Sequence, residues 1–282
     1  MRKLASVVAL VLCIPVASWA WGPEGHRIVA EIAQSHLSPP ARRQVQELMG
    51  SDDLGSISTW ADEIRNERPQ TFGWHFVDIP WNAAGFDESR DCFRPADKHG
   101  SEDHHNCVVD RIEIFARTLA DQRASTADRA EALKFLVHFV ADIHQPLHAV
   151  AEARGGNDIH VVEFGSTECG SRPCNLHFVW DEGLIRHKGL SELSYVSYLE
   201  KLIAREERAA GTPEDWANES FHLAHTIWLN DGGRVDEAYY QKYIGIVDER
   251  LGLAGIRLAH LLNQCLDRAA EDRAAEDQAA NR

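Results

Sequence analysis

The stretch V-H-F-V-A-D-I-H-Q-P-L-H, residues 137–148, decides how this chain is organised, because it sets polar ligand types among apolar residues. His138 and Asp142 are four residues apart, so a helix presents both on one face. Pro146 ends or kinks that helix, because its ring clashes with an earlier carbonyl and it donates no N–H. The bend lets His148 approach the same centre from another direction. Imidazole and carboxylate suit Zn²⁺; a half-buried helix whose histidines are bonded to neighbours is the alternative.

A second pair with the same spacing follows in N-L-H-F-V-W-D, where His177 and Asp181 flank three apolar residues. Two such pairs in one chain are hard to attribute to chance, so the sequence predicts more than one metal site. Between the two stretches, R-G-G-N-D-I-H-V-V-E-F (154–164) predicts a glycine turn and one alternating strand. Asn157 comes just after two glycines, where the backbone can approach a ligand closely.

The segment that starts at Trp21 carries another candidate pair. Pro23 in W-G-P-E-G-H predicts a helix start, and His26 falls in the first turn. If the mature chain begins at Trp21, its α-amino group has a pKa near 8 and could chelate a metal together with its carbonyl oxygen. His26 would bind alongside. The alternative is that Trp21 is only an apolar anchor.

A carboxylate and a guanidinium are close together in I-S-T-W-A-D-E-I-R. Asp62 adjoins the apolar face of this predicted helix, an expensive place for an unpaired carboxylate, and Arg65 follows three residues later. An ordinary surface ion pair is the alternative.

The segment W-H-F-V-D-I-P is short, aromatic and β-branched, which favours an extended strand for residues 74–80. In a strand His75 and Val77 share one side, whereas Phe76 and Asp78 share the other. On the first side, His75 could bind a metal. On the second side, the ring of Phe76 could stack on a base and the carboxylate of Asp78 could accept a hydrogen bond from it. A core strand with one polar edge is the alternative.

Residues 1–20 have the pattern of an export signal, in which two basic residues precede a short apolar run and the cleavage sequence S-W-A. The prediction is a secreted or periplasmic protein that begins at Trp21. The formal charge of −15 excludes nucleic-acid binding through a basic surface. If the protein handles phosphates, bound metal is the natural source of positive charge.

The other patterns indicate one mostly α domain over residues 21–267, with a short β element and a charged Ala-rich tail at 268–282. Predicted helices include residues 108–120, 127–149 and 236–267. Cys92–Cys107 and Cys169–Cys174 are the local disulfide pairings that an exported protein would form. They leave Cys265 as a buried free thiol, which its helical surroundings favour, or as an intermolecular linker.

Taken together, these motifs resemble the secreted zinc-dependent single-strand nucleases of the S1/P1 type, which are distant relatives of the bacterial zinc phospholipases C. The resemblance extends from Trp21 to about Cys265 and implies a single helical domain of that type. The motifs that carry it are W-G-x-x-G-H, W-A-D-x-I-R, H-F-V-D, H-F-x-x-D-I-H-Q-P-L-H, G-G-N and N-L-H-x-x-W-D.

The resemblance implies three Zn²⁺ ions, each with its own ligand set. The implied ligands are Asp62, His75, His138 and Asp142 for the first ion, the Trp21 amine and carbonyl, His26 and a bridging Asp142 for the second, and His148, His177 and Asp181 for the third. The resemblance also implies that Phe76 stacks on a base, that Asp78 bonds the edge of the base and that Asn157 helps to hold the nucleotide. His144 matches no ligand position. It is expected to hold the metal-binding residues in place without binding a metal itself.

The implied activity is hydrolysis of single-stranded DNA and RNA to 5′-nucleotides, with 3′-nucleotidase activity on nucleoside 3′-monophosphates. Asp62 and Arg65 are the expected catalytic residues, and Arg65 would offset charge on the phosphoryl oxygens while the metals activate water. No stable protein partner and no membrane association are implied. The alternatives are phospholipase C activity, against which Asp181 argues because those relatives carry glutamate there, and a non-catalytic secreted zinc-binding protein.

Overall fold

The computed structural model describes residues 21–93, 105–203 and 210–280, with side chains up to residue 267. The predicted export signal lies outside these residues. The helices of the first half are α1 (Pro23–Ser35), α2 (Pro39–Met49), α3 (Leu54–Ile57), α4 (Trp60–Glu63), the 3₁₀ helices η1 (Ile64–Asn66) and η2 (Pro69–His75), α5 (Glu88–Asp91), α6 (Val108–Ala120) and α7 (Thr126–Asp142). Those of the second half are the 3₁₀ helix η3 (Pro146–Ala149), α8 (Ala153–Gly156), α9 (Leu176–Phe178), the π-helical turn η4 (Val179–Gly183), α10 (Leu184–Lys188), α11 (Glu192–Ile203), α12 (Pro213–Ile227) and α13 (Glu237–Ala280).

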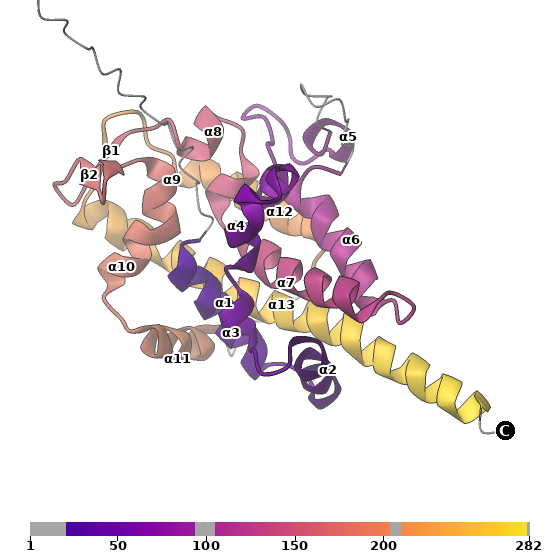
Figure 1. Cartoon of the computed structure of the whole chain (residues 1–282). Helices are drawn as coiled ribbons and strands as arrows, with labels where there is room; N and C mark the ends of the chain where they lie inside the picture. Colours follow the sequence, from indigo (N-terminus) through magenta and orange to yellow (C-terminus); the bar gives the residue numbers. More distant parts are fainter. Residues whose placement is uncertain (1–20, 94–104, 204–209, 281–282) are drawn as a thin grey trace, which may run out of the picture.

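Helix α13 is the long support against which the other helices pack. It crosses the whole molecule and its last turns project beyond the other elements (Figure 1), with α1, α6 and α7 alongside. The side chains of Val247, Leu251, Leu258 and Leu262 are fully buried. They are four or seven residues apart, which places them on one face of the helix. The predicted amphipathic helix over 236–267 is therefore present, and it continues into the Ala-rich tail.

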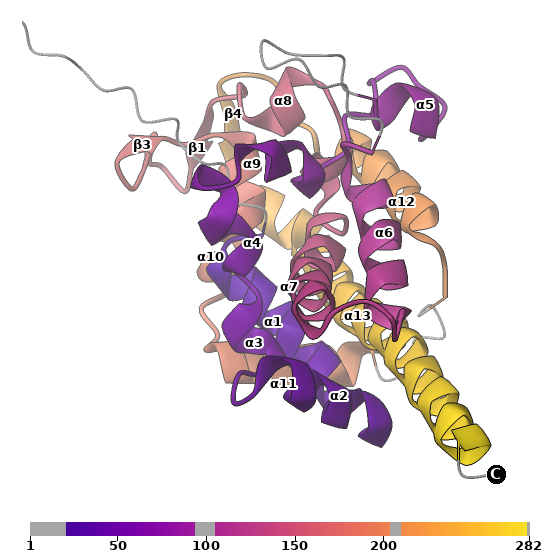
Figure 2. The ribbon, with the colours of Figure 1, turned by 45° about the vertical axis from the view of Figure 1, so that its right-hand side comes forward.

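Helix α7 is the innermost helix and carries the central motif. Ser125 caps its first turn by accepting a hydrogen bond from the N–H of Asp128 at 3.1 Å. From Phe135 to Asp142 every side chain is fully buried, because α6 packs on one side of the helix and α1, α4 and α13 cover other sides (Figure 2). A helix that is enclosed all round has to bury its polar residues as well, so His138 and Asp142 lie in the interior.

The predicted end of this helix, at residue 149, is wrong by seven residues. The α-helix stops at Asp142 and tight turns follow, in which the N–H of Gln145 bonds the carbonyl of Asp142 at 2.9 Å. Gln145 itself is extended, as expected for a residue before proline, whose ring disfavours the helical conformation there. Helix η3 then begins at Pro146 and carries His148 back toward α7.

The strand predicted for residues 74–80 is not formed. Trp74 and His75 end the 3₁₀ helix η2, and an extended segment follows. This segment pairs with the η3 region through Val77 N–H to His148 O at 2.8 Å and Ala151 N–H to Ile79 O at 2.9 Å. The expected alternation of burial is present nevertheless, since Val77 is buried whereas the side chain of Asp78 is exposed.

The β structure is confined to two small sheets at one end of the molecule (Figure 1). Strand β1 (Val161–Glu163) pairs in parallel with β4 (Gly233–Val235), and β2 (Glu168–Cys169) pairs antiparallel with β3 (Arg172–Pro173). Both predicted disulfides are formed, and Cys265, whose thiol is buried as predicted, takes part in neither of them. Within the described residues, no helix has both the length and the apolar character needed to cross a bilayer.

A buried charge network fixes the turn that follows α7. Arg250 and Arg257, both on α13, share Glu219 of α12, with nitrogen–oxygen distances of 2.6 Å to Glu219 Oε2. Arg250 also donates to the carbonyl of His144 at 3.1 Å, and the ring of His144 bonds Arg257 at 3.0 Å. Ser220 completes the network by donating to the carbonyl of Ile143. The turn between Asp142 and Pro146 is thus held to α12 and α13.

We expect Glu219→Gln to lower the free energy of unfolding by about 2–3 kcal/mol at neutral pH, because it leaves two guanidinium groups without their shared anion. The estimate lies below the usual figure for fully buried pairs, since 40% of the Glu219 side chain is exposed. Chemical denaturation measures the difference. Glu214→Gln, in the exposed first turn of the same helix, is the control and should cost less than about 1 kcal/mol.

The difference in unfolding free energy between the wild type and Glu219→Gln should be smaller in acid. Burial would raise the pKa of Glu219, but its hydrogen bonds with Arg257 and Arg250 outweigh this and lower the pKa to about 2. The stabilisation is therefore fully present above the unfolded value near pH 4.5 and is lost as the pH falls toward 2. A stability difference that stays constant from pH 7 to pH 2.5 would contradict this role of Glu219.

Candidate metal centre

Eight buried histidine and aspartate side chains converge in the interior from seven elements of the chain. They are His26 of α1, Asp62 of α4, His75 at the end of η2, His138 and Asp142 of α7, His148 of η3, His177 of α9 and Asp181 of η4. All are candidates from the sequence, and the structure brings them into three groups whose potential ligand atoms lie within 4.8 Å of one another. These groups are Asp62 with His75 and His138, His26 with His138 and Asp142, and His148 with His177 and Asp181.

The first group lies between α4, η2 and α7. Nε2 of His138 lies 3.6 Å from Asp62 Oδ2 and 3.3 Å from Asp142 Oδ2. Nδ1 of His75 lies 3.0 Å from the same Asp142 oxygen. Arg65, one turn after Asp62, places a terminal nitrogen 3.0 Å from Asp62 Oδ1 and lines the adjoining cavity. This pair is therefore buried at a site and is not the ordinary surface pair that the sequence also allowed.

The second group shares His138 with the first, and its Asp142 also lies beside His75 of the first group. Nε2 of His26 lies 3.3 Å from Asp142 Oδ1, so the two carboxylate oxygens of Asp142 face different groups. The rings of His26 and His138 stack at 3.8 Å. Trp21 is fully buried at the start of α1, and the N–H of the next residue, Gly22, donates to the carbonyl of Asp181 at 2.8 Å. The backbone at Trp21 is thus fixed beside η4, which carries Asp181 of the third group.

The third group joins η3 to the α9–η4 turn. Nε2 of His177 lies 3.4 Å from Asp181 Oδ2, and the rings of His148 and His177 are 4.9 Å apart. The other oxygen of Asp181 accepts a hydrogen bond from the Gln145 amide at 2.6 Å. The turn that carries Asp181 is π-helical, a widened form that is frequent at functional sites.

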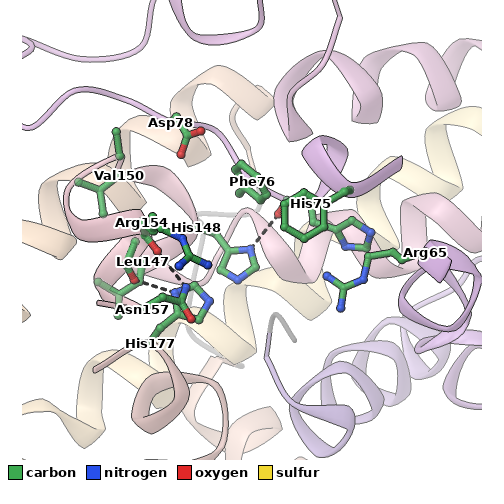
Figure 3. A pocket seen from close by; sticks show the side chains of 13 residues that line it. Arg65, His75, Phe76, Asp78, Leu147, His148, Val150, Arg154, Asn157 and His177 are labelled. Atoms are coloured by element: carbon green, nitrogen blue, oxygen red, sulfur yellow. Dashed lines mark hydrogen bonds between the residues drawn. The ribbon is translucent and has the colours of Figure 1, made fainter. Parts of the chain in front are cut away.

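Backbone carbonyls orient three of the imidazoles. Nδ1 of His138 donates to Ser58 O at 2.7 Å, Nδ1 of His148 to His75 O at 2.8 Å (dashed in Figure 3), and Nδ1 of His177 to Gly155 O at 2.7 Å. Each bond fixes the tautomer and leaves Nε2 with a lone pair directed into its group. This is the arrangement that metal-binding histidines usually have. His144 differs, because its Nδ1 donates to Val140 O at 2.7 Å and its Nε2 is already bonded to Arg257.

The donor atoms fit bound metal because the protein alone leaves them unsatisfied. Buried nitrogen Nε2 of His26, His138, His148 and His177 has no hydrogen-bond partner, and neither has Oδ1 of Asp142. Leaving so many buried polar atoms unpaired is costly, and native structures usually explain each case. Cations among these nitrogen and oxygen atoms would satisfy them, and a mixed imidazole and carboxylate set suits zinc.

The electrostatics of the groups point the same way. Burial lowers the pKa of His26, His75 and His148 well below the usual value, and it lowers that of His177 to about 4. Burial raises the pKa of Asp142. The histidines are therefore neutral at pH 7, which is the form that binds metals, whereas the carboxyl groups need nearby positive charge to ionise fully.

A cavity of about 350 Å³ opens on the first and third groups. Its walls include Phe76, Asp78 and Asn157, the three residues that the sequence nominated for substrate, together with Arg65 (Figure 3). Phe76 packs edge-on against the exposed ring of Phe72, with ring centroids 5.7 Å apart.

Among the residues that line this cavity, sequence reasoning did not identify the aromatic ring of Phe72 or the guanidinium of Arg154. Phe72 lies in an irregular 3₁₀ segment, so no periodicity marked its side as facing the cavity. Arg154 directly precedes the two glycines of R-G-G-N, and that position was the available signal.

Other groups of possible donors are already used. Glu163 lies beside Cys169 and Cys174, and Asp110 lies beside Cys92 and Cys107, but in both groups the sulfurs are joined in a disulfide.

Comparison with known proteins gives an independent line of information. A model of the S1/P1 nuclease family matches residues 21–267. Nuclease P1 of Penicillium citrinum is 31% identical over 280 residues, which cover 86% of this chain and 97% of that protein. Endonuclease 2 of Arabidopsis thaliana is 30% identical over 275 residues, which cover 86% of this chain and 90% of that protein. Nuclease S1 of Aspergillus oryzae is 28% identical over 297 residues, covering 93% and 98%.

We expect Zn²⁺ to raise the melting temperature of metal-depleted protein, because ions that bind only the folded groups shift the unfolding equilibrium. Zinc at about 100 times its dissociation constant adds about 2.7 kcal/mol for one site, which corresponds to at least about 5 °C in a chain of this size. Differential scanning calorimetry measures the shift. Mg²⁺ at equal concentration is the control, since it prefers oxygen ligands, and equal melting temperatures with both ions would contradict the assignment.

Proposed function

Because this chain belongs to the S1/P1 nuclease family, and is therefore a nuclease, we propose that it cleaves single-stranded DNA and RNA to 5′-nucleotides with three bound Zn²⁺ ions. The same site would remove phosphate from nucleoside 3′-monophosphates. The observation that carries this proposal is the convergence of three buried donor groups beside one cavity whose wall holds an aromatic ring, a carboxylate and an amide.

In this proposal the three groups hold one ion each. Asp62, His75, His138 and Asp142 hold the first, Asp142 and His26 hold the second with the amine and carbonyl of Trp21, and His148, His177 and Asp181 hold the third. The support is the geometry of the donors and their unsatisfied nitrogens.

The Trp21 amine becomes a ligand only when the leader is removed, which agrees with export of the protein. Zinc content tests this point, since protein with one extra residue before Trp21 should hold about one ion fewer than protein that begins there.

Bound zinc supplies Lewis acidity toward phosphoryl oxygens and lowers the pKa of water, which makes a nucleophile available near neutral pH. The chain's own residues supply position and charge. Arg65, held at 3.0 Å from Asp62, presents its guanidinium to the cavity, where it would stabilise negative charge as it develops on the phosphoryl oxygens. Asp62 thus has two tasks, as a ligand and as the group that fixes Arg65.

The cavity wall explains a preference for single strands. A base that stacks on Phe76 and bonds Asp78 through its edge has to leave its neighbours and its pairing partner, and this costs a few kcal/mol in a duplex and less in a single strand. Asn157 donates to the carbonyl of Arg154 at 2.9 Å, which fixes its side chain in the cavity wall, where it can hold the nucleotide.

A competition assay tests the proposal. Zinc-loaded protein that begins at Trp21 is mixed with a single-stranded oligonucleotide and phosphatidylcholine vesicles, and the products are identified by mass spectrometry. Chelator-sensitive 5′-mononucleotides with intact lipid are the expected result. Diacylglycerol and phosphocholine would instead assign phospholipase C activity to the same metal centre, whereas zinc binding without any turnover would make the protein a zinc-binding protein only.

We expect Asp142→Asn to abolish nuclease activity and to remove about two of the three zinc ions, because Asp142 faces two donor groups with separate oxygens. Metal analysis after gel filtration measures the content. The control is Asp158→Asn, which removes an exposed carboxylate just after the R-G-G-N turn. This variant should keep all the zinc. An Asp142→Asn protein with full zinc and full rate would show that the carboxylate bridges nothing.

Phe76→Ala should raise KM for single-stranded oligonucleotides about 5- to 150-fold, because stacking of a base on an aromatic ring contributes about 1–3 kcal/mol. The zinc content should not change, since Phe76 is not a ligand in the proposal. Steady-state kinetics and metal analysis of the same preparation check both points. An unchanged KM would mean that Phe76 serves packing against Phe72 and not substrate binding.

A further inference from the structure

The R-G-G-N turn holds a strained backbone that directs an arginine to the cavity. Ala153 and Arg154 have φ values of 44° and 55°, and the two glycines that follow also have positive φ. Glycine adopts this left-handed region at no steric cost, but other residues lose about 1–2 kcal/mol each. Strain of this kind persists only where the surroundings hold it in place, and it clusters at ligand-binding sites.

Part of that strain serves the metal centre, because the carbonyl of Gly155 accepts the hydrogen bond from Nδ1 of His177 at 2.7 Å. A β-carbon on Gly155 would collide with the carbonyl of Leu147, so glycine is required there. Neither contact requires arginine at the preceding position. Glycine or asparagine would adopt the backbone of Arg154 more easily, so the side chain itself needs an explanation.

The guanidinium of Arg154 is available to an anion. It lines the cavity together with Asn157 and His177, on the wall opposite Arg65 (Figure 3). Its ion pair is with Asp158, at 3.1 Å, and the two side chains are 73% and 54% exposed. An exposed pair of this kind contributes at most about 1 kcal/mol, so a phosphate can replace the carboxylate at little cost.

We propose that Arg154 binds the 5′-phosphate of the nucleotide whose base stacks on Phe76, an assignment that rests on the proposed function. In that function the 3′-phosphate of this nucleotide is at the metal groups, next to Arg65. Asn157, which holds the nucleotide, is bonded to the backbone of Arg154. The guanidinium of Arg154, on the same wall as Asn157, would therefore face the 5′-phosphate of this nucleotide. Arg154 is a specificity-determining residue in this view, because it distinguishes a polymer from a nucleoside 3′-monophosphate.

The test compares two substrates that differ only in that phosphate, the thymidine dinucleotide TpT and its 5′-phosphorylated form pTpT. In the wild type we expect kcat/KM to be about tenfold higher for pTpT, mainly through KM. Arg154→Ala should remove this preference and leave TpT within about twofold. Arg154→Lys should keep part of it. The slope of log KM for oligothymidylate against log salt should fall by about 0.7 in the alanine variant.

Two controls separate the side chain from the backbone and from net charge. Arg154→Gly relieves the left-handed strain and removes the guanidinium, so it should behave as Arg154→Ala does, with full zinc content. Arg117→Ala removes an exposed arginine of α6 that is paired with Glu113, and it should keep the preference for pTpT. A glycine or alanine variant that holds its zinc and still prefers pTpT would overturn the proposal.

Binding without turnover separates failure of this inference from failure of the proposed function. The probes are the same two dinucleotides with a methylphosphonate linkage, and calorimetry measures their affinity for zinc-loaded protein. Tighter binding of the 5′-phosphorylated probe that disappears in Arg154→Ala supports the role of Arg154 even if no strand is cleaved. Equal affinities in the wild type would refute the role, whatever the nuclease assay shows.

Discussion

The buried carboxylate of Asp142 is the group on which the rest of the structure depends. One of its oxygens lies beside His75 and His138, and the other lies beside His26. Burial raises the pKa of this group, because water cannot solvate its charge. Such a carboxylate ionises readily only when cations are close to it. The surrounding helices supply the neutral imidazoles that would hold those cations, and the fold can be understood as the enclosure that this cluster needs.

The enclosure is built from both ends of the chain. Helix α1 brings His26 to α7 from one side, and α13 packs on both of these helices over much of its length. Arg250 and Arg257 then fix the turn after Asp142, since one bonds the backbone of His144 and the other its ring. They hold the change of direction that lets η3 return His148 to the interior.

Metal also reconciles the charge of the chain with its substrate. A chain with a formal charge of −15 should repel a polyanion. In the proposed function, the positive charge that meets the polyanion would come from the two guanidinium groups on opposite walls of the cavity and from cations bound at the donor groups. Attraction confined to the cleft would let the outer surface stay acidic, in contrast to proteins that grip nucleic acid through a basic face.

The sequence by itself determined the helical class, the two disulfides and the identity of the candidate ligands. These follow from local rules, since a spacing of four residues places His138 and Asp142 on one face in any helix, and two close cysteines can pair without the rest of the fold. The three-metal grouping came from the resemblance to a known family, because spacing alone does not show which distant histidines meet.

Only the tertiary structure decided the partners of these groups. Contacts between segments far apart in sequence decide which carbonyl fixes each imidazole and where α7 ends. They also decide that His75 ends a 3₁₀ helix and does not lie in a strand. Arg154 is the clearest case. Its neighbours in the sequence indicate a turn, but the turn's left-handed backbone and the cavity that its guanidinium faces exist only when η3, α8 and α9 are packed together, because long-range packing is what holds a strained conformation in place.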